Sequence, residues 1–409
     1  MKRKHTLLKV GLVGVAGLLL PLVGAGRAVA DYAPGPGDVV GIGGDTPQFA
    51  AEFAADGDLA GDAGWNTSGS YNKLVAFLAT ADGNGHASYA VGSTLAAPIA
   101  GNPTVTLRAG TAPVLRNTSS GSSITALLAD TSKQVNYVFS TTAPTAAQQT
   151  TAGNSTHNWG FLHVTQIGTD SIDIAAVNIP ASGSNPAVVS NAPAGLSVTD
   201  LVNIYDGTWT TWGQVPGYSA THTSAQDSAT IVPLLPPSSS TLTSTLLKAL
   251  TAADLPNTFA FAGTTQVEQN DPTAITSLPA TQEVNAIVPF SAARLSLWNS
   301  GYFHAPTSSV SAGAVLTPGV SLLTATADGN GTAAWTGAID AYIIFRQTDL
   351  TSNSTPFEPG SSLNWAEALF SNPSNPSAQP YFENFGAADI AAAGFTPSYV
   401  DHNTAFSIG

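Results

Sequence analysis

The sequence contains no cysteine, which excludes disulfides, thiolate metal sites and a lipid anchor attached to a cysteine. Charge is also scarce, because Asp, Glu, Lys and Arg together make up 9% of the 409 residues. Of the 12 basic residues, five lie within the first 27 positions, and all 26 acidic residues follow them. The remainder of the chain is therefore strongly acidic, which disfavours nucleic acid and anionic membranes as partners.

Common catalytic and cofactor-binding motifs are missing as well. The sequence has no G-x-S-x-G, H-E-x-x-H, G-x-x-x-x-G-K or G-x-G-x-x-G pattern. Ser70 and Lys73 match S-x-x-K, but no S-D-N or K-T-G partner accompanies them, so we interpret this match as chance. His157 and His163 do not have the spacing of a zinc site. We predict no catalytic residue, no metal site and no cofactor.

The N-terminus carries the pattern of a secretory signal peptide. Lys2, Arg3 and Lys4 precede the apolar run VGLVGVAGLLLPLVGAG, and the small-residue sequence Ala28-Val29-Ala30 follows it. Nothing later approaches the roughly 18 uninterrupted apolar residues of a membrane span. We therefore predict that residues 1–30 are removed after Ala30 and that the mature protein is secreted, either extracellular or held at the cell wall.

What the sequence does contain is a recurring order of strand, polar turn and helix. Residues 38–56 have a β-branched strand, a Gly turn and a helix, and the same order recurs in 104–130 and 229–250. Such alternation predicts an α/β protein with a largely parallel sheet, long enough for two domains. Further candidates are a strand at 171–180, a helix at 196–207, a strand entering a helix at 283–298, a strand at 338–349 and a helix at 361–370.

Hydroxyl side chains crowd the turn of the third unit, where SSSTLTST follows a double proline at residues 236–237. The first turn of a helix leaves N–H groups without partners, and Ser or Thr can cap them. One cap needs one hydroxyl, so the remaining hydroxyls either belong to the loop or face a ligand. The same two alternatives, helix cap or ligand contact, hold for Asp45 and Thr46 in the first unit.

Several segments, in order, resemble the phosphate-binding-protein family of periplasmic solute receptors. GIGGDTPQFA is similar to its opening Gly-rich loop, VLRNTSSGSSITAL to its second ligand loop, and QVNYVFSTTAP to a strand that ends in a ligand-touching Ser-Asp pair. LSVTDLVNIYDGTWTTWGQV is similar to a segment with the pattern Ile-Tyr-x-Gly-x-Ile-x-x-Trp, and ATIVPLLPPSSSTLTSTLL falls where the family has a Ser-Gly-Thr loop.

This resemblance implies a type II periplasmic-binding-protein fold, with two α/β lobes, a two-stranded hinge and a discontinuous first lobe. Residues 31–170 and 300–409 are then expected in lobe 1, and residues 171–299 in lobe 2. The ligand is expected in the cleft, because helix N-termini and hydroxyls from both lobes suit an anion. The implied ligand-binding residues are Asp45, Thr46, Ser120, Ser140, Thr141, Ser239, Ser240 and Thr241.

The chain departs from the family in two respects. Thr141 stands where the family has an Asp that accepts the proton of hydrogen phosphate, and apolar residues stand where it has an Arg near the Ser-Gly-Thr loop. Asp45 is a candidate for the role of the carboxylate. Arg116, at the start of the second loop, is a possible cationic ligand, with a surface ion pair as the alternative.

The resulting expectation is a secreted, non-catalytic solute-binding protein, monomeric, that closes on a small oxyanion such as phosphate or sulfate. The family further implies the permease of an ABC importer as a partner. The alternative is an extracellular or cell-wall interaction protein on a degenerate receptor fold, with no ligand or a different one.

Overall fold

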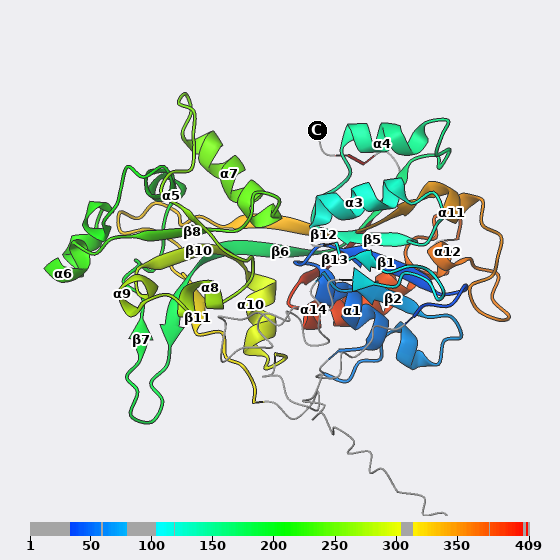
Figure 1. Ribbon diagram of the computed structural model, residues 1–409, viewed down its shortest axis with the longest axis horizontal. Coiled ribbons are helices and arrows are strands. Elements are labelled where there is room, and N and C mark those ends of the chain that lie inside the picture. Colours follow the sequence, from blue (N-terminus) through cyan, green and yellow to red (C-terminus); the bar gives the residue numbers. More distant parts are fainter. Residues whose placement is uncertain are drawn as a thin grey trace, which may run out of the picture.

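The computed structural model describes residues 33–58, 60–79, 104–117, 119–303, 314–375, 377–403 and 406–407. The predicted signal peptide lies outside these ranges. The main sheet has the strand order β2-β1-β5-β12-β6-β10-β8-β9, with helices on both sides (Figure 1). The α/β class is confirmed. No helix in the described ranges combines the length and apolar character needed to cross a membrane.

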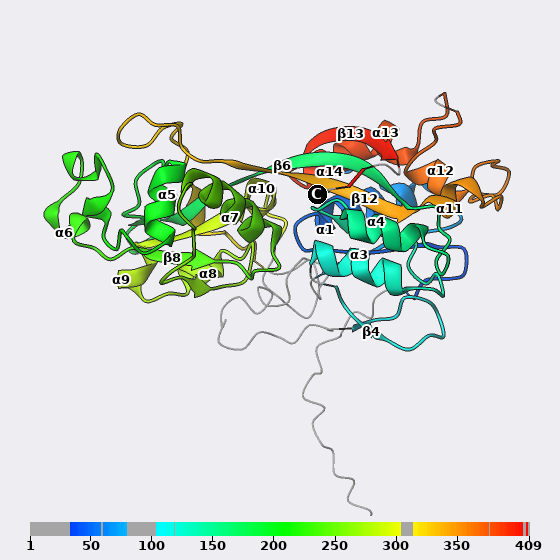
Figure 2. The ribbon, with the colours of Figure 1, turned by 90° about the horizontal axis from the view of Figure 1, so that it is seen from above.

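The strands fall into two groups, and Figures 1 and 2 show them as two lobes side by side. The first lobe contains the parallel strands β1 (Val39–Gly43), β2 (Leu74–Phe77) and β5 (Tyr137–Ser140). The second lobe contains the parallel strands β8 (Val232–Leu235), β9 (Thr265–Gln266) and β10 (Ala286–Ser291).

Two long strands run between the lobes. β6 (Leu162–Ile179) pairs antiparallel with β12 (Gly337–Arg346) in the first lobe and with β10 in the second. β12 also pairs antiparallel with β5. The sheet is thus mixed, whereas the sequence predicted a largely parallel one, because the connecting strands run against their neighbours in both lobes. The first lobe is discontinuous, as expected.

The remaining elements cover the faces and edges of this sheet. The helices of the first lobe are α1 (Gln48–Asp56), α3 (Ser120–Ala129), α4 (Ala146–Gly153), α11 (Gln347–Thr351), α12 (Trp365–Leu369), α13 (Tyr381–Asn384) and α14 (Gly386–Ala392). The second lobe has α5 (Val198–Tyr205), α6 (Ser224–Asp227), α7 (Thr241–Ala253), α8 (Thr273–Thr276) and α9 (Ala280–Glu283), and α10 (Ala292–Asn299) lies between the lobes.

The short elements complete the description. β13 (Thr396–Asn403), β7 (Val188–Val189) and β11 (Val320–Leu322) all pair with β6, and β3 (Thr104–Val105) pairs with β4 (Val114–Leu115) in a separate ribbon. The 3-10 helices are Trp65–Ser68, Trp212–Gln214 and Tyr218–Ala220.

Tyr302 and Phe303 contact Phe49 of α1 in the first lobe, whereas residues 320–335 contact the second lobe. Val320 pairs with Val177 in the second-lobe half of β6, and the Leu323 backbone N–H donates to Ile174. Trp335 N–H then donates to the carbonyl of Leu196, just before α5. Residues 320–335 therefore pack with the second lobe before β12 crosses back.

Candidate functional site

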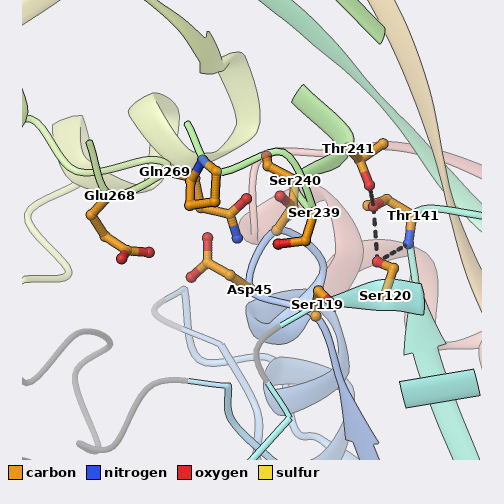
Figure 3. A pocket seen from close by; sticks show the side chains of 12 residues that line it. Asp45, Ser119, Ser120, Thr141, Ser239, Ser240, Thr241, Glu268 and Gln269 are labelled. Carbon is orange, nitrogen blue, oxygen red and sulfur yellow. Dashed lines mark hydrogen bonds between the residues drawn. The ribbon is translucent and has the colours of Figure 1, made fainter. Parts of the chain in front are cut away.

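Five segments of the chain meet at a pocket between the lobes (Figure 3). Four of them are the loops that follow β1, β5, β8 and β9, and the fifth is the turn before α3. In α/β sheets, ligand sites form at the carboxyl ends of parallel strands, where such loops gather. The cavity measures about 170 Å³. Its lining residues are Gly44, Asp45, Thr46, Ser119, Ser120, Thr141, Pro237, Ser239, Ser240, Thr241, Glu268 and Gln269.

Three helices begin at the lining of this pocket. α1 starts directly after the β1 loop, α3 starts at Ser120 and α7 starts at Thr241. Ser119 caps α3 by accepting a hydrogen bond from Ser122 N, and Ser240 caps α7 by accepting one from Leu242 N. The first-turn N–H groups and dipoles of all three helices place partial positive charge at the pocket.

The structure separates the residues of the hydroxyl cluster into a helix cap and residues that only line the pocket. Ser240 is the cap of α7, whereas the exposed Ser239 and the half-buried Thr241 line the pocket without capping it. Asp45 and Thr46 do not cap α1, whose N-cap residue is Pro47 without a side-chain bond. Their side chains instead contact residues from outside the first lobe.

A chain of hydroxyl groups spans the cleft. Ser120 Oγ accepts a hydrogen bond from Thr141 N at 2.8 Å and lies 3.0 Å from Thr141 Oγ1. Thr141 Oγ1 lies 2.7 Å from Thr241 Oγ1, which belongs to the second lobe. Figure 3 shows these three side chains in a row along one side of the pocket. The structure thus joins residues that are 100 positions apart in the chain.

The opposite side of the pocket carries carboxylates and an amide. Asp45, Glu268 and Gln269 extend their polar groups there (Figure 3). Glu268 is exposed at the rim, while Asp45 is 3% exposed. No Lys or Arg is among the residues that line this pocket in the described part of the chain.

The Asp45 carboxylate is held by partners from three segments. Gln48 Nε2 donates to Oδ1 at 2.8 Å, and Asn270 Nδ2 donates to Oδ2 at 3.0 Å. Arg294 Nη2, from α10, lies 3.2 Å from Oδ1 and donates to the Asp45 carbonyl at 2.7 Å. The carboxylate is therefore charge-paired by Arg294 within the protein.

A second buried carboxyl lies next to this pair. Burial raises the pKa of Asp271 to about 6, and the charge of Asp45 adds to the effect. Hydrogen bonds from Thr273 and the nearby Arg294 act in the opposite direction. Asp271 is outside the pocket lining, but its charge and that of Asp45 interact.

Seven of the nine residues expected from the sequence line the pocket, and two do not. Ser140 is fully buried, and its hydroxyl donates to the carbonyl of Thr142 at 2.7 Å. Arg116 Nη1 donates to the carbonyl of Leu78 at 2.9 Å, away from the lining residues. That the seven lining residues contact a ligand stays a prediction.

Sequence reasoning missed Glu268, Gln269, Asn270 and Arg294. The first three follow β9, which pairs in parallel with β8, so both strands end at the same edge of the sheet. Recognising the two-residue strand β9 as a neighbour of β8 would have placed this loop at the cleft. Arg294 lies inside a helix and is 249 residues from Asp45 in the chain, so no local pattern marks it.

Comparison with known proteins identifies a family. A family model described as a PBP superfamily domain matches residues 81–347, more than half of the chain. No curated protein matches the sequence.

Three solved structures that resemble this chain are distant from it in sequence. A putative phosphate ABC transporter substrate-binding protein with bound phosphate from Clostridium perfringens is 10% identical, with a TM-score of 0.43 over 88% of this chain and 100% of that one. A phosphate binding protein from Stenotrophomonas maltophilia is 13% identical, with a TM-score of 0.42 over 88% and 90%. The ancestral soluble variant of the human phosphate binding protein is 15% identical, with a TM-score of 0.44 over 88% and 90%.

Proposed function

Because the chain belongs to the PBP superfamily and has its type II fold, we propose that it is a secreted, non-catalytic solute-binding protein that closes on a small oxyanion. We further propose phosphate as that oxyanion, from the resemblance of its loops to those of phosphate-binding proteins. The observation that supports this best is the convergence of three helix N-termini and the hydroxyls of both lobes on one small pocket.

The chemistry of the lining favours an anion that still carries a proton. Helix N-termini and hydroxyls donate hydrogen bonds to oxyanion oxygens. A carboxylate at the pocket accepts a hydrogen bond from the O–H group of hydrogen phosphate but repels sulfate, which has no such group at neutral pH. We assign the acceptor role to Glu268, whose carboxylate lines the pocket opposite the hydroxyl groups.

Ligand binding would act by closing the two lobes around the pocket. A ligand that contacts Ser120 and Thr141 on one side and Thr241 on the other makes more contacts in the closed than in the open state, which shifts the population toward closure. We propose residues 171–299 together with 320–335 as the second lobe, because the latter segment packs on β6 and on the residues before α5.

The remaining parts of the proposal concern the cell. Residues 1–30 would direct secretion, and the chain would act as a monomer that presents its closed form to the permease of an ABC importer. Without a cysteine for a lipid anchor, the mature protein would be released or held at the cell wall by other means.

Thermal unfolding with a panel of solutes tests the proposal. Phosphate should raise the unfolding temperature in a saturable way, since a ligand at 100 times its Kd stabilises the native state by about 2.7 kcal/mol. Sulfate, amino acids and sugars should have smaller effects.

Glu268→Gln should narrow the preference for phosphate over sulfate, whereas Asp62→Asn, an exposed carboxylate outside the pocket lining, should leave it unchanged. If no oxyanion shifted the unfolding temperature, the degenerate-cleft interaction protein would become the better account.

A further inference from the structure

We propose that Arg294 is a positioning residue for the oxyanion pocket and acts through Asp45, by cancelling the charge of that carboxylate and fixing the loop that carries it. This inference rests on the proposed function. Arg294 itself is not among the pocket-lining residues, whereas Asp45 is. Any influence of Arg294 on a bound anion must therefore pass through Asp45 or through the electric field of the pair.

The geometry fixes the guanidinium group on two sides. Nη2 donates to the Asp45 backbone carbonyl at 2.7 Å and lies 3.2 Å from its Oδ1. One nitrogen therefore contacts both the backbone and the side chain of Asp45. The guanidinium carbon lies 4.6 Å from the centre of the Phe49 ring, in the first turn of α1. Arg294 thus clamps the pocket loop and the start of the helix that follows it.

The position of Arg294 is in turn set by the strand that connects the lobes. Asp170 on β6 accepts hydrogen bonds from Ser291 Oγ at 2.6 Å and Ala293 N at 2.8 Å, which holds the N-terminus of α10. Arg294 N donates to Ser291 Oγ at 3.0 Å. The backbone that carries Arg294 is therefore held by β6, a strand that both lobes share.

Charge makes this pair more than a packing contact. Asp45 and Arg294 have side chains that are 3% and 1% exposed, so water screens neither charge effectively. Gln48 and Asn270 also donate to Asp45, but both are neutral. Arg294 Nη1 is buried and has no hydrogen-bond partner in the part of the chain that the structure describes, and Asp45 is the carboxylate with which Arg294 forms its ion pair there.

Removal of Arg294 should therefore weaken anion binding, whereas removal of the Asp45 charge should strengthen it. Without Arg294, a buried uncompensated carboxylate at the lining repels an anion. Without the Asp45 charge, the buried guanidinium attracts one. A pair with a purely structural role would weaken binding whichever partner is lost, so the sign of the effect separates the two roles.

Titration of the full-length mature protein with inorganic phosphate tests this prediction. We expect Arg294→Met to weaken the affinity by about tenfold or more, and Asp45→Asn to strengthen it. The double variant should recover most of the loss seen in Arg294→Met. Arg116→Met, which removes an arginine that does not line the pocket, is the matched control and should change the affinity by less than about twofold.

Equal losses in both single variants, with no recovery in the double variant, would overturn the inference while leaving phosphate binding intact. Absence of binding by the wild type would overturn the proposed function itself and this inference with it. If Arg294→Met failed to fold, the sign of the Asp45→Asn effect would decide, since a structural role predicts a loss and the charge role does not.

Discussion

Single buried carboxyls carry much of the electrostatic character of this protein. Burial raises the pKa of Asp170 to about 6, although hydrogen bonds from Ser291 and Ala293 favour its ionised form. Burial likewise raises the pKa of Asp389 to about 6, with Tyr381 donating to its Oδ2 at 3.0 Å. Because only 9% of the residues are charged, few cationic side chains are available to compensate the negative charge of such carboxylates.

The raised pKa of Asp170 predicts how the free energy of unfolding depends on pH. Its folded pKa lies above the unfolded value, so the native state binds the proton more tightly, and the associated stability is present below about pH 4 and is lost as the pH rises through about 6. A shift of this size corresponds to about 3 kcal/mol at most. Asp170→Asn should remove most of that loss, because an amide is neutral at every pH.

The measurement is chemical denaturation at pH 4.5 and pH 7.5, compared between the variant and the wild type. Between these pH values, the unfolding free energy of Asp170→Asn should fall by about 2 kcal/mol less than that of the wild type. Asp56→Asn, an exposed carboxylate, should follow the wild type. An unchanged slope in Asp170→Asn would show that this carboxyl is ionised throughout the range.

Sequence patterns led to pocket-lining residues where a motif marks a loop, but not where burial sets the direction of the side chain. The hydroxyls at 120, 141 and 239–241 follow strand-turn-helix patterns and line the pocket. Ser140 alternates with Thr141 at the end of β5, so its side chain points away from the lining into the buried interior. Arg294 and Asn270 required the tertiary fold, because their partner Asp45 is more than 200 residues away.

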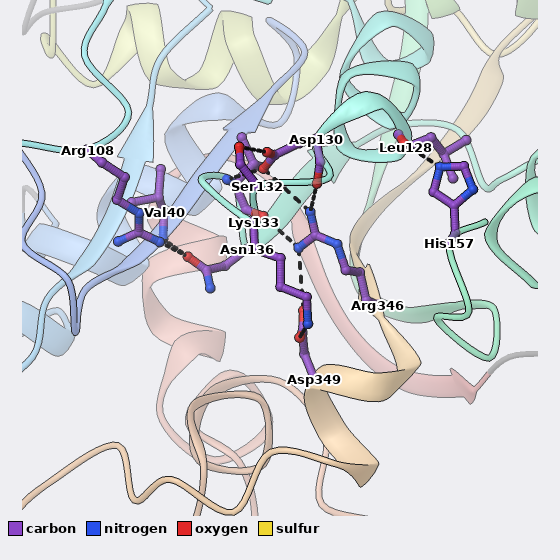
Figure 4. A network of polar contacts seen from close by, with 11 residues as sticks. Val40, Arg108, Leu128, Asp130, Ser132, Lys133, Asn136, His157, Arg346 and Asp349 are labelled. Carbon is purple, nitrogen blue, oxygen red and sulfur yellow. Dashed lines mark hydrogen bonds and ion pairs between the residues drawn. The ribbon is translucent and has the colours of Figure 1, made fainter. Parts of the chain in front are cut away.

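Elements are joined in the first lobe by a second buried arginine, at the end of β12 (Figure 4). Arg346 is fully buried, donates to the carbonyls of Val135 and Asp130, and pairs with the carboxylates of Asp130 and Asp349. Its guanidinium carbon lies 4.5 Å from the centre of the Trp159 ring. It thereby ties β12 to the end of α3 and the approach to β5.

Arg346→Met should destabilise the protein by about 3–5 kcal/mol, because it leaves buried carboxylates and carbonyls without their cationic partner. Lys133→Met is a matched control, since Lys133 pairs with the same Asp349 at 3.2 Å but is 52% exposed. The control should cost no more than about 1 kcal/mol. Denaturant titration at neutral pH measures the free energy of unfolding of both variants. Equal losses of stability would show that burial does not make the Arg346 ion pairs stronger than that of Lys133.

The order of elements was predictable from periodicity, but their limits were not. The strand and helix expected at 283–298 are β10 and α10, and the helix expected at 196–207 is α5, after which Gly207 adopts a φ of +80°. The strand expected at 171–180 begins nine residues earlier, at Leu162. Its first half contains polar residues and Gly168, which do not favour a strand locally. Pairing with β12 and β13 nevertheless keeps this half extended.

At the scale of the whole molecule, the arrangement of lobes follows from the two connecting strands. Sequence resemblance gave the order of lobes and the discontinuous first lobe, because the loop motifs occur in a fixed order. It did not place residues 320–335 with the second lobe, since that segment carries no motif and is held by backbone hydrogen bonds to β6 and to Leu196. Long-range pairing of this kind is invisible to local patterns.

We propose that one small oxyanion bridges hydroxyls of both lobes, and calorimetric titration with phosphate can decide this. The wild type should bind one phosphate, and Ser120→Ala and Thr241→Ala, from opposite lobes, should each weaken binding by about tenfold. Ser122→Ala and Thr251→Ala, exposed positions on the same two helices, should bind as the wild type does. Phosphate affinity that is unaffected by Ser120→Ala and Thr241→Ala would contradict the account.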